Sequence, residues 1–466
     1  MRIHPRSKIT PLACLITGFL PFLSADEIPV RLFDPGYLQG DCNYHSLTAA
    51  SDGKLYFSVS THEPRSAARL FRFDPVSESM EQIGDLAEIL GQDPAKEILH
   101  GKIHTPLIEH DGWLYFSTHT SSYRGSLPNM RPDNGRVPYP GGHFMRYNLA
   151  TGAYEDLANL GLPNEGIITM ALEPESETLY GLTWPTGLLL SYNLEDRLLL
   201  NWGAVQQRGE WGHPGTDWNF ICRDLAVDGD GVLYGSTDTG RIWKFDTEDP
   251  RPVSFYKDLD LAAVAPVQEE GFSLPEETHY FWHNWRAISW NPNTGSFWGI
   301  QGGSTQLFEF IPSTGVLRSV ASLRADGVPR LARRSAYRSQ LGFMLGPDNT
   351  LFYLAHAPGE SVDGRMDIKT SVHLLTYRID TGEVTDHGPL ETSTGERVFF
   401  TESIAIGPDD HLYTVAWVES IDPEQQETIR AARGAEGPDE TDQVIYRIQL
   451  VQLPEWQSLV RHPNDR

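Results

Sequence analysis

The sequence is poor in cysteine and in basic residues. It has 3 cysteines in 466 residues, which excludes a disulfide-built scaffold, although Cys42 and Cys222 could either pair or remain free buried thiols. Lysine and arginine together number 37 against 63 acidic residues, giving a net charge of −26. Nucleic acid and membranes are therefore not expected partners, because both require a basic face. An anionic ligand bound at a locally basic site is still compatible with this charge.

Several familiar signatures are also missing. The chain has no Ser nucleophile elbow, Walker loop, Rossmann fingerprint or HExxH motif, which removes the enzyme classes built on them. Long helical periodicity is nearly absent, and residues 85–99 are the best candidate for a short helix. One apolar stretch, residues 11–23, stands out, but it is too short to span a bilayer comfortably.

This apolar stretch belongs to a predicted signal peptide. Three basic residues precede it and the small residues Ser24 and Ala25 follow it, so residues 1–25 have the pattern that a signal peptidase removes. The mature chain, residues 26–466, is therefore expected to be secreted, either to a periplasm or outside the cell.

What the sequence does contain is a repeat. A polar turn followed by a Leu-Tyr-Phe-like strand occurs seven times, for example as GKLYFSVS at Gly53 and GVLYGSTD at Gly231. A second alternating strand follows each copy, such as RLFRFD from Arg69 or RIWKFD from Arg241. The first strands share an anchor residue at intervals of about 60 residues: Leu55, Leu114, Leu179, Leu233, Phe297, Leu351 and Leu412.

This repeat predicts the fold class. Strands that alternate in period 2 and are joined by DG-type turns form a four-stranded antiparallel blade. Seven such blades predict an all-β fold, a seven-bladed β-propeller, as a single domain over 26–466 and as a monomer. Residues 28–33 are expected to close the ring as an outer strand of the last blade. The acidic segment 422–442 is expected to be a surface loop.

The repeat also predicts which residues share one face of the ring, because equal offsets in successive blades lie at equal depths. We define three rings of positions in this way. The first lies ten residues before each anchor, the second lies five residues after it, and the third lies at the start of the third strand. The first ring is His45, His104, Thr169, Arg223, Ala287 with Arg286 beside it, Leu341 and Glu402. The second is Ser60, His119, Trp184, Asp238, Gly302, His356 and Trp417. The third is Arg69, His143, Leu188, Arg241, Gln306, His373 and Val444.

Histidines are concentrated on these rings. Six of the 16 histidines in the chain fall there, whereas random placement would put fewer than one. The second blade carries His104, His119 and His143 on all three rings, so we expect these side chains to converge on one pocket. With Arg223 they are the predicted catalytic residues.

Further residues of the same face are predicted to bind substrate. They are His45, Asp238, Arg241, Arg286 and His356, together with Trp184 and Trp417, which could stack on sugar rings or pack in the core. Two loops expected on this face are rich in arginine, and Arg binds carboxylate or sulfate bidentately. These loops contribute Tyr123, Arg124, Tyr139, Arg334, Tyr337 and Arg338.

The predicted face suits β-elimination from a uronic-acid polysaccharide better than glycoside hydrolysis, because its carboxylates Asp238 and Glu402 come from non-adjacent blades. In β-elimination, a cation neutralises the uronate carboxylate so that the C5 proton becomes acidic. A neutral His or Tyr can then remove that proton, while a second one protonates the departing O4.

A family resemblance points the same way. The segment KIHTPLIEHDGWLYFSTHT…YPGGHFMRYN resembles the active-site region of secreted propeller polysaccharide lyases, such as the ulvan lyases. The resemblance implies that His119 and His143, 24 residues apart, act with an arginine, matched here by Arg223, and with a tyrosine. Tyr123, Tyr139 and Tyr337 are candidates for that tyrosine. The expected activity is cleavage of an anionic, uronate-containing and optionally sulfated polysaccharide.

Two alternatives stay open. The chain is also similar to oligogalacturonate lyase, another propeller, which implies a divalent metal at a His-rich site formed by His104, His119 and His143. A metal-dependent propeller lactonase or lyase would use such an ion. The other alternative is a non-catalytic propeller that binds a glycan or a protein.

Overall fold

The computed structural model describes residues 27–121, 137–211, 219–247, 249, 252–264, 283–325, 340–357, 371–433 and 444–460. The predicted signal peptide lies outside these residues. Most of the regular structure within them is β-strand. The helices are α1 (Leu86–Leu90), the 3-10 helix η2 (Leu261–Val264), α3 (Pro423–Arg433) and α4 (Trp456–Val460). None of these helices has the length and apolar character that crossing a bilayer requires.

The strands of the described residues form five four-stranded antiparallel sheets and one nine-stranded sheet. The first two sheets are β2 (Leu47–Ala49), β3 (Leu55–Val59), β4 (Arg69–Asp74), β5 (Ser79–Asp85), and β6 (Ile108–His110), β7 (Trp113–Ser117), β8 (His143–Asn148), β9 (Tyr154–Asn159). The third is β10 (Gly166–Glu173), β11 (Thr178–Trp184), β12 (Leu188–Asn193), β13 (Leu198–Ala204). The last two are β14 (Ala226–Val227), β15 (Leu233–Ser236), β16 (Arg241–Phe245), β17 (Val253–Asp260), and β18 (Trp285–Asn291), β19 (Ser296–Gln301), β20 (Gln306–Ile311), β21 (Val316–Ser322).

The nine-stranded sheet brings together the two ends of the described chain. Its strands are β22 (Phe343–Leu345), β23 (Thr350–Ala357), β24 (Ser371–Arg378), β25 (Glu383–Thr392), β1 (Ile28–Phe33), β29 (Tyr446–Glu455), β28 (His411–Glu419), β26 (Val398–Thr401) and β27 (Ala405–Ile406). Strand β1 is the link, because it pairs in parallel with β25 and antiparallel with β29. The prediction that residues 28–33 form an outer strand of the last blade is confirmed by the pairing with β29. The parallel pairing with β25 was not predicted.

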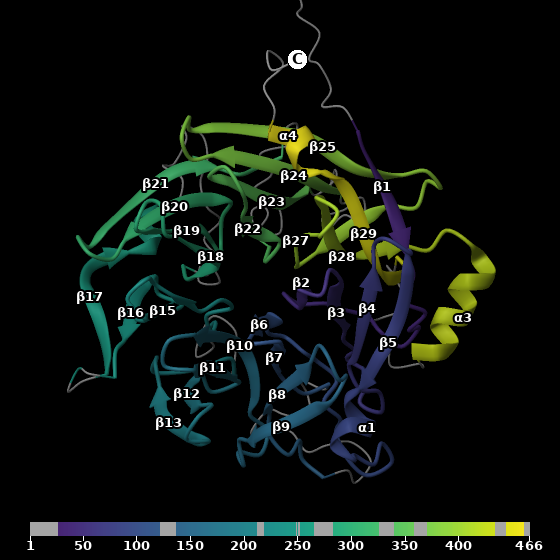
Figure 1. The fold of residues 1–466 in the computed structure, drawn as a ribbon, viewed down its shortest axis with the longest axis horizontal. Helices are drawn as coiled ribbons and strands as arrows, with labels where there is room; N and C mark the ends of the chain where they lie inside the picture. The colour runs from purple at the N-terminus through teal and green to yellow at the C-terminus, as the bar shows by residue number, and fades with distance from the viewer. Residues whose placement is uncertain are drawn as a thin grey trace, which may run out of the picture.

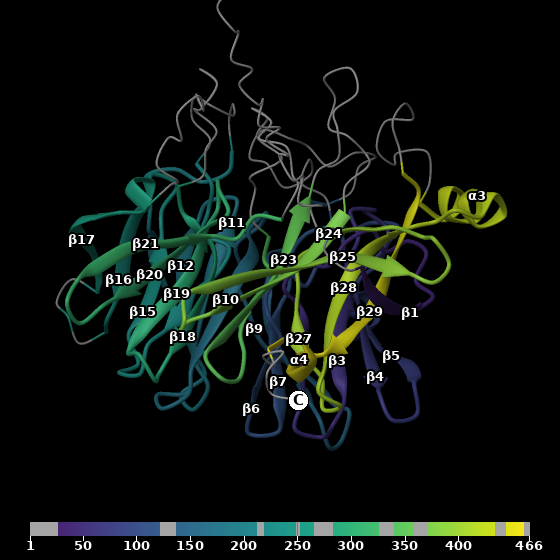
Figure 2. The same cartoon turned by 90° about the horizontal axis from the view of Figure 1, so that it is seen from above.

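The sheets stand around a central axis as a β-propeller (Figure 1), with the first strand of each four-stranded sheet nearest the centre and the last at the rim. Seen from the side, α3 lies at the outer edge (Figure 2). The four-stranded antiparallel unit that the repeat predicts is confirmed in five sheets. The described strands thus form six sheets against the seven blades predicted, because β1 joins β25 to β29 within one sheet.

Hydrophobic cores lie between neighbouring sheets. Successive strand residues point to opposite faces, so Leu70 and Phe71 of β4 belong to different cores. Leu70 shares a core with Phe116 of β7, whereas Phe71 shares one with Val415 of β28. The first sheet therefore packs both against the second sheet and against the last strands of the chain. The seven anchor residues are all buried, and none is more than 1% exposed.

Local signals explain the hairpins. Strands β6 and β7 are joined by Asp111 and Gly112 alone, whose φ angles are 48° and 75°. Two successive positive φ angles are the type I′ geometry that two-residue hairpins favour, and an Asp-Gly pair adopts it readily. This turn fixes the pairing register of β6 and β7 beside the anchor residue Leu114.

Three expectations need correction. The helix expected over 85–99 is limited to α1, because Asp85 caps its N-terminus and Gly91, at φ 66°, ends it after five residues. The segment expected as an acidic loop contains α3 instead. Strand β29 begins at Tyr446, so the third-ring position Val444 precedes it.

Candidate active site

The first ring converges on an ion pair near the centre of the propeller. Arg286 of β18 forms a buried salt bridge with Glu402, which follows β26. The backbone N–H of Leu341 donates to Glu402 Oε2 at 2.6 Å, and the N–H of His45 donates to the Glu402 carbonyl at 3.0 Å. Four first-ring positions, separated by up to about 350 residues in sequence, thus meet in one place.

His104 and His119 also lie together. Their ring centroids are 5.9 Å apart in an edge-to-face arrangement, and they are 3% and 0% exposed. His104 Nδ1 lies 2.8 Å from the carbonyl oxygen of Ile168. Because a carbonyl oxygen only accepts, Nδ1 must carry the proton, and the neutral ring then has its basic lone pair on Nε2. The position of His119 is set by backbone hydrogen bonds exchanged with Lys102, at 2.8 and 3.1 Å.

Both imidazoles are held in the neutral form. Burial lowers the pKa of His104, and the positive charges of Arg223, Arg286 and Lys102 lower it further. Burial likewise lowers the pKa of His119, with smaller contributions from Lys102, His104 and Arg223. The site therefore combines neutral bases with nearby guanidinium groups, an arrangement suited to removing a proton beside an anionic group.

Arg223 is anchored by a residue that the sequence analysis did not identify. Its Nη2 donates to Glu210 Oε2 at 2.9 Å and its Nη1 donates to the Ile221 carbonyl at 2.7 Å. Trp184 Nε1 donates to the same Glu210 oxygen at 3.0 Å. Glu210 lies in the loop between β13 and β14, outside the counted positions, so the ring offsets could not have found it.

Asp238 lies near the same charges. Burial raises its pKa to about 7, and the nearby Glu210 raises it while Arg223 opposes the change. A carboxyl group that is half protonated near neutral pH can donate a hydrogen bond to an anion at lower pH and repels an anion at higher pH.

A run of aromatic rings crosses this region from sheet to sheet. Tyr44, which the sequence analysis also missed, stacks on His104 with centroids 4.2 Å apart and an interplanar angle of 13°. The other neighbouring pairs in the run are Trp184 with His119 (5.3 Å), Tyr44 with Trp417 (6.4 Å), Trp417 with Phe400 (4.7 Å) and Phe400 with His356 (5.7 Å). We call these seven residues, Trp184, His119, His104, Tyr44, Trp417, Phe400 and His356, the aromatic belt. Only Tyr44, Phe400 and His356 within it are partly exposed.

His45 lies beside the belt, next to Tyr44 in the chain. Its Nδ1 is 3.9 Å from Asp224 Oδ1. Burial and the charge of Arg286 lower the pKa of His45 to about 4, while burial raises the pKa of Asp224 to about 8. This pair is therefore largely uncharged at neutral pH.

His143 contacts a different set of residues from the other two predicted histidines. Its Nδ1 lies 2.9 Å from Asp156 Oδ1, and its Nε2 lies 2.9 Å from Asn159 Nδ2. Its ring faces that of His100, at 4.9 Å, and His100 Nδ1 in turn lies 2.8 Å from the hydroxyl of Tyr139. Strand β9, which supplies Asp156 and Asn159, thus holds both ring nitrogens of His143.

The three-histidine metal site that the sequence suggested is not formed. In the part of the chain that the structure describes, the groups close enough to share an ion are Asp41 with Cys42 and His62, and His110 with Asp111 and Glu177. Neither contains His104, His119 or His143. Cys42 and Cys222 are both free and buried.

The remaining predicted residues are placed as follows. Arg241 is exposed and lies over the ring of Phe255, at 4.3 Å. The loop residues Tyr123, Arg124, Arg334, Tyr337 and Arg338 lie outside the described residues.

Comparison with known proteins supports the fold and leaves the activity open. A family model for the N-terminal part of strictosidine synthase-like proteins matches residues 224–245, a short segment that includes β15 and β16. No curated protein matches the chain. A solved structure of a protein from Lactobacillus plantarum is 11% identical, with a TM-score of 0.50, covering 86% of this chain and 99% of that one.

Two further solved structures show lower structural scores. A candidate 6-phosphogluconolactonase from Bacteroides uniformis is 13% identical with a TM-score of 0.46, covering 86% of this chain and all of that one. A chain of the mitotic checkpoint complex is 12% identical with a TM-score of 0.45, covering 89% of this chain and 95% of that one. At these identities the likeness concerns the fold alone.

Proposed function

We propose that this protein is a polysaccharide lyase that cleaves an anionic, uronate-containing polymer by β-elimination. The observation that carries the proposal is the pairing of two neutral imidazoles, His104 and His119, whose pKa values are lowered by burial and by the positive charges of Lys102, Arg223 and Arg286. Glycoside hydrolysis needs two carboxyl groups flanking one bond, whereas this site offers a base without a charge of its own and cations to receive an anion.

In the proposed reaction, Arg223 neutralises the uronate carboxylate and so increases the acidity of the proton at C5. His104 Nε2 takes that proton, the C5–H electron pair forms the C4=C5 double bond, and the C4–O4 bond breaks. The hydroxyl of Tyr44, stacked on His104, gives its proton to the departing O4. The imidazolium then returns its proton to the phenolate through solvent, which restores both groups.

The aromatic belt supports a sugar polymer as the substrate. Tyr and Trp rings present an apolar face and a polar tip, which suits the apolar face and hydroxyl groups of a pyranose. Tyr44 lies just before β2, Phe400 and His356 lie on β26 and β23 of the nine-stranded sheet, and all three are partly exposed. A ligand that contacts all three must follow the belt from Tyr44 past Trp417 to Phe400 and His356, which suits an oligosaccharide better than a small lactone.

We also propose that the ring has seven blades and that the mature chain is exported. Supporting seven blades, Phe352 and Leu354 of β23 share a core with Leu412 and Val418 of β28. Strands within one flat sheet cannot pack face to face, so the nine-stranded sheet acts as two blades joined by β1. Supporting export, residues 1–25 have the composition of a signal peptide.

A non-catalytic glycan-binding propeller is the second candidate, and the burial of His119 at 0% exposure favours it. The two candidates are separated by incubating the purified chain with ulvan, pectate, alginate and glycosaminoglycans. A lyase produces an unsaturated uronate whose ultraviolet absorbance rises with time. A binding propeller retains one of the polymers in an affinity gel without any rise, and that result would contradict the lyase proposal.

A further inference from the structure

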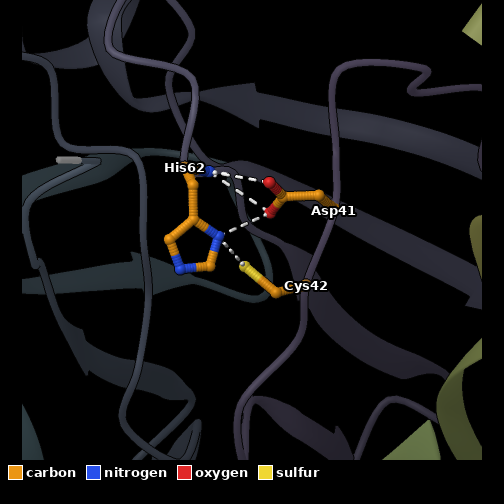
Figure 3. Close-up of side chains that lie close together, drawn as sticks. All are labelled: Asp41, Cys42 and His62. Atoms are coloured by element: carbon orange, nitrogen blue, oxygen red, sulfur yellow. Dashed lines mark hydrogen bonds and ion pairs between the residues drawn. The ribbon is translucent and has the colours of Figure 1, made fainter. Parts of the chain in front are cut away.

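A second cluster of reactive side chains lies near Tyr44. Asp41 and Cys42 precede β2 and His62 follows β3, and their ligand atoms all lie within 4.8 Å of one another (Figure 3). The ring of Tyr44 is 6.5 Å from that of His62. Neither the repeat nor the proposed lyase reaction uses this cluster.

Backbone hydrogen bonds fix the two segments that carry the cluster. Cys42 and Ser60 form an isolated antiparallel bridge. The N–H groups of Asp41 and Cys42 both donate to the Ser60 carbonyl, at 3.0 and 3.2 Å, and Ser60 N–H donates back to the Cys42 carbonyl at 2.8 Å. The N–H of His62 donates to both carboxylate oxygens of Asp41, each at 3.2 Å. The ligand atoms are therefore positioned before anything binds.

Two further potential metal ligands surround His62 Nδ1. This nitrogen lies 3.0 Å from Asp41 Oδ1 and 3.7 Å from Cys42 Sγ, although it can donate at most one proton. With Zn–S near 2.3 Å and Zn–N near 2.0–2.1 Å, a tetrahedral zinc ion places sulfur and nitrogen about 3.6 Å apart. The observed nitrogen–sulfur separation of 3.7 Å is close to that value. The 3.0 Å between Nδ1 and Asp41 Oδ1 would lengthen to about 3.4 Å through a small rotation of the carboxylate.

We propose that Asp41, Cys42 and His62 form a three-ligand site for Zn²⁺, with the fourth position open to water. Thiolate, imidazole and carboxylate are the donors that Zn²⁺ takes, and three protein ligands with one open position are typical of sites that bind a small molecule at the metal. The side chain of His62 is 38% exposed, so an ion can reach the cluster from solvent.

Lys102 is the group that opposes binding. Its buried ammonium donates to the Thr120 carbonyl at 3.1 Å and interacts with both Cys42 and Asp41. Thiolate and carboxylate together balance the charge of Zn²⁺, so the charge of Lys102 becomes surplus once the ion is bound. Lys102→Met removes this charge at nearly constant volume and should tighten Zn²⁺ binding. If the cluster is only a set of hydrogen bonds and not a metal site, the substitution will not change the affinity for Zn²⁺.

The test is a metal titration of the purified full-length chain after treatment with a chelator. Co²⁺ is added first, because a tetrahedral Co²⁺–thiolate site gives visible bands and a near-ultraviolet charge-transfer band, and Zn²⁺ is then added to displace it. We expect one equivalent of each ion to bind. Cys42→Ser should abolish the charge-transfer band, and the matched control Cys222→Ser, which alters the other buried thiol, should retain it.

A second variant keeps the test decisive if Cys42→Ser fails to fold. His62→Gln changes a partly exposed side chain and should weaken Zn²⁺ binding at least about 10-fold. Even the loss of a residue that only hydrogen-bonds to a metal ligand typically weakens metal binding by about this factor. Absence of a thiolate band in the wild-type chain, or a band that survives Cys42→Ser and disappears in Cys222→Ser, would overturn the proposal.

Discussion

Arg286 forms a buried ion pair with Glu402, a residue 116 positions further along the chain. The two side chains are 7% and 3% exposed, so neither charge is well solvated without the other. The pair joins the fifth four-stranded sheet to the nine-stranded sheet across the centre of the propeller. It also contributes to the positive environment that lowers the pKa of His104.

Breaking this pair should be costly. Arg286→Met leaves Glu402 as an uncompensated buried charge, and we expect the free energy of unfolding to fall by about 3–5 kcal/mol. Chemical denaturation measures this change. The matched control is Arg31→Met, which breaks the exposed pair with Glu78 and should cost at most about 1 kcal/mol. Equal losses in the two variants would contradict the central placement of Arg286.

Strand β1 should stabilise the whole ring, because it joins β25 to β29. Val30 is 6% exposed and packs in the core between these strands. Val30→Ala should lower the free energy of unfolding by about 1–3 kcal/mol through loss of buried apolar surface. Thermal unfolding checks this, with Val76→Ala, at a residue 90% exposed, expected to change the midpoint very little. A loss from Val30→Ala no greater than that of Val76→Ala would argue against closure by β1.

Asp224 should make the protein less stable as the pH rises. Its pKa is raised by burial from 3.8 to about 8, so the folded chain retains a proton that the unfolded chain releases. The free energy of unfolding therefore falls between about pH 4 and pH 8. Asp224→Asn removes this dependence, and its oxygen can still accept from the Ile288 N–H, which lies 2.9 Å from Asp224 Oδ2.

We expect the Asp224→Asn variant to gain stability relative to the wild type on going from pH 5 to pH 8, on the order of 2–4 kcal/mol. Denaturant midpoints at the two pH values measure the gain. A difference between the variants that does not change with pH would show that Asp224 is already ionised in the folded chain.

Much of the fold follows from short-range sequence signals. The anchor leucines, the Asp-Gly turn before Leu114 and the alternation along β4 each have a local physical cause, and the structure bears them out. The bounds of β1 were also predictable from its alternating pattern. Its parallel pairing with β25 was not, because residues 28–30 and 390–392 are brought together only by completion of the ring.

The sequence could predict where along the channel the backbone of a site residue lies, but not where its side chain points. Equal offsets correctly identified the first-ring residues that gather at Glu402, since each offset fixes a depth along the channel. They could not fix the direction of a side chain, so His143 was grouped with His104 although Asp156 and Asn159 hold its ring elsewhere. Glu210 and Tyr44 lie outside the counted positions, so the ring offsets did not select them.

Helix α3 could have been predicted from a local sequence signal. The prediction gave more weight to the acidic composition of the segment. Asp422 accepts from the Glu424 N–H at 3.0 Å, and Pro423 occupies the first helical position. A side-chain cap followed by proline is a strong start signal for a helix. The acidic composition of the segment favoured a loop, but Arg433 near the end of the helix binds the carbonyls of Leu38 and Tyr446 and docks it.

The most direct test of the proposed function is the kinetic effect of removing the imidazole of His104. On a uronate polymer that the wild-type chain cleaves, His104→Ala should lower kcat by about 10²–10⁴-fold, the range that general base catalysis contributes. The control His373→Ala removes a histidine that is paired with Asp386 on β25, away from His104, and should leave kcat within about twofold. Unsaturated product formed at equal rates by the wild type and His104→Ala would contradict the account.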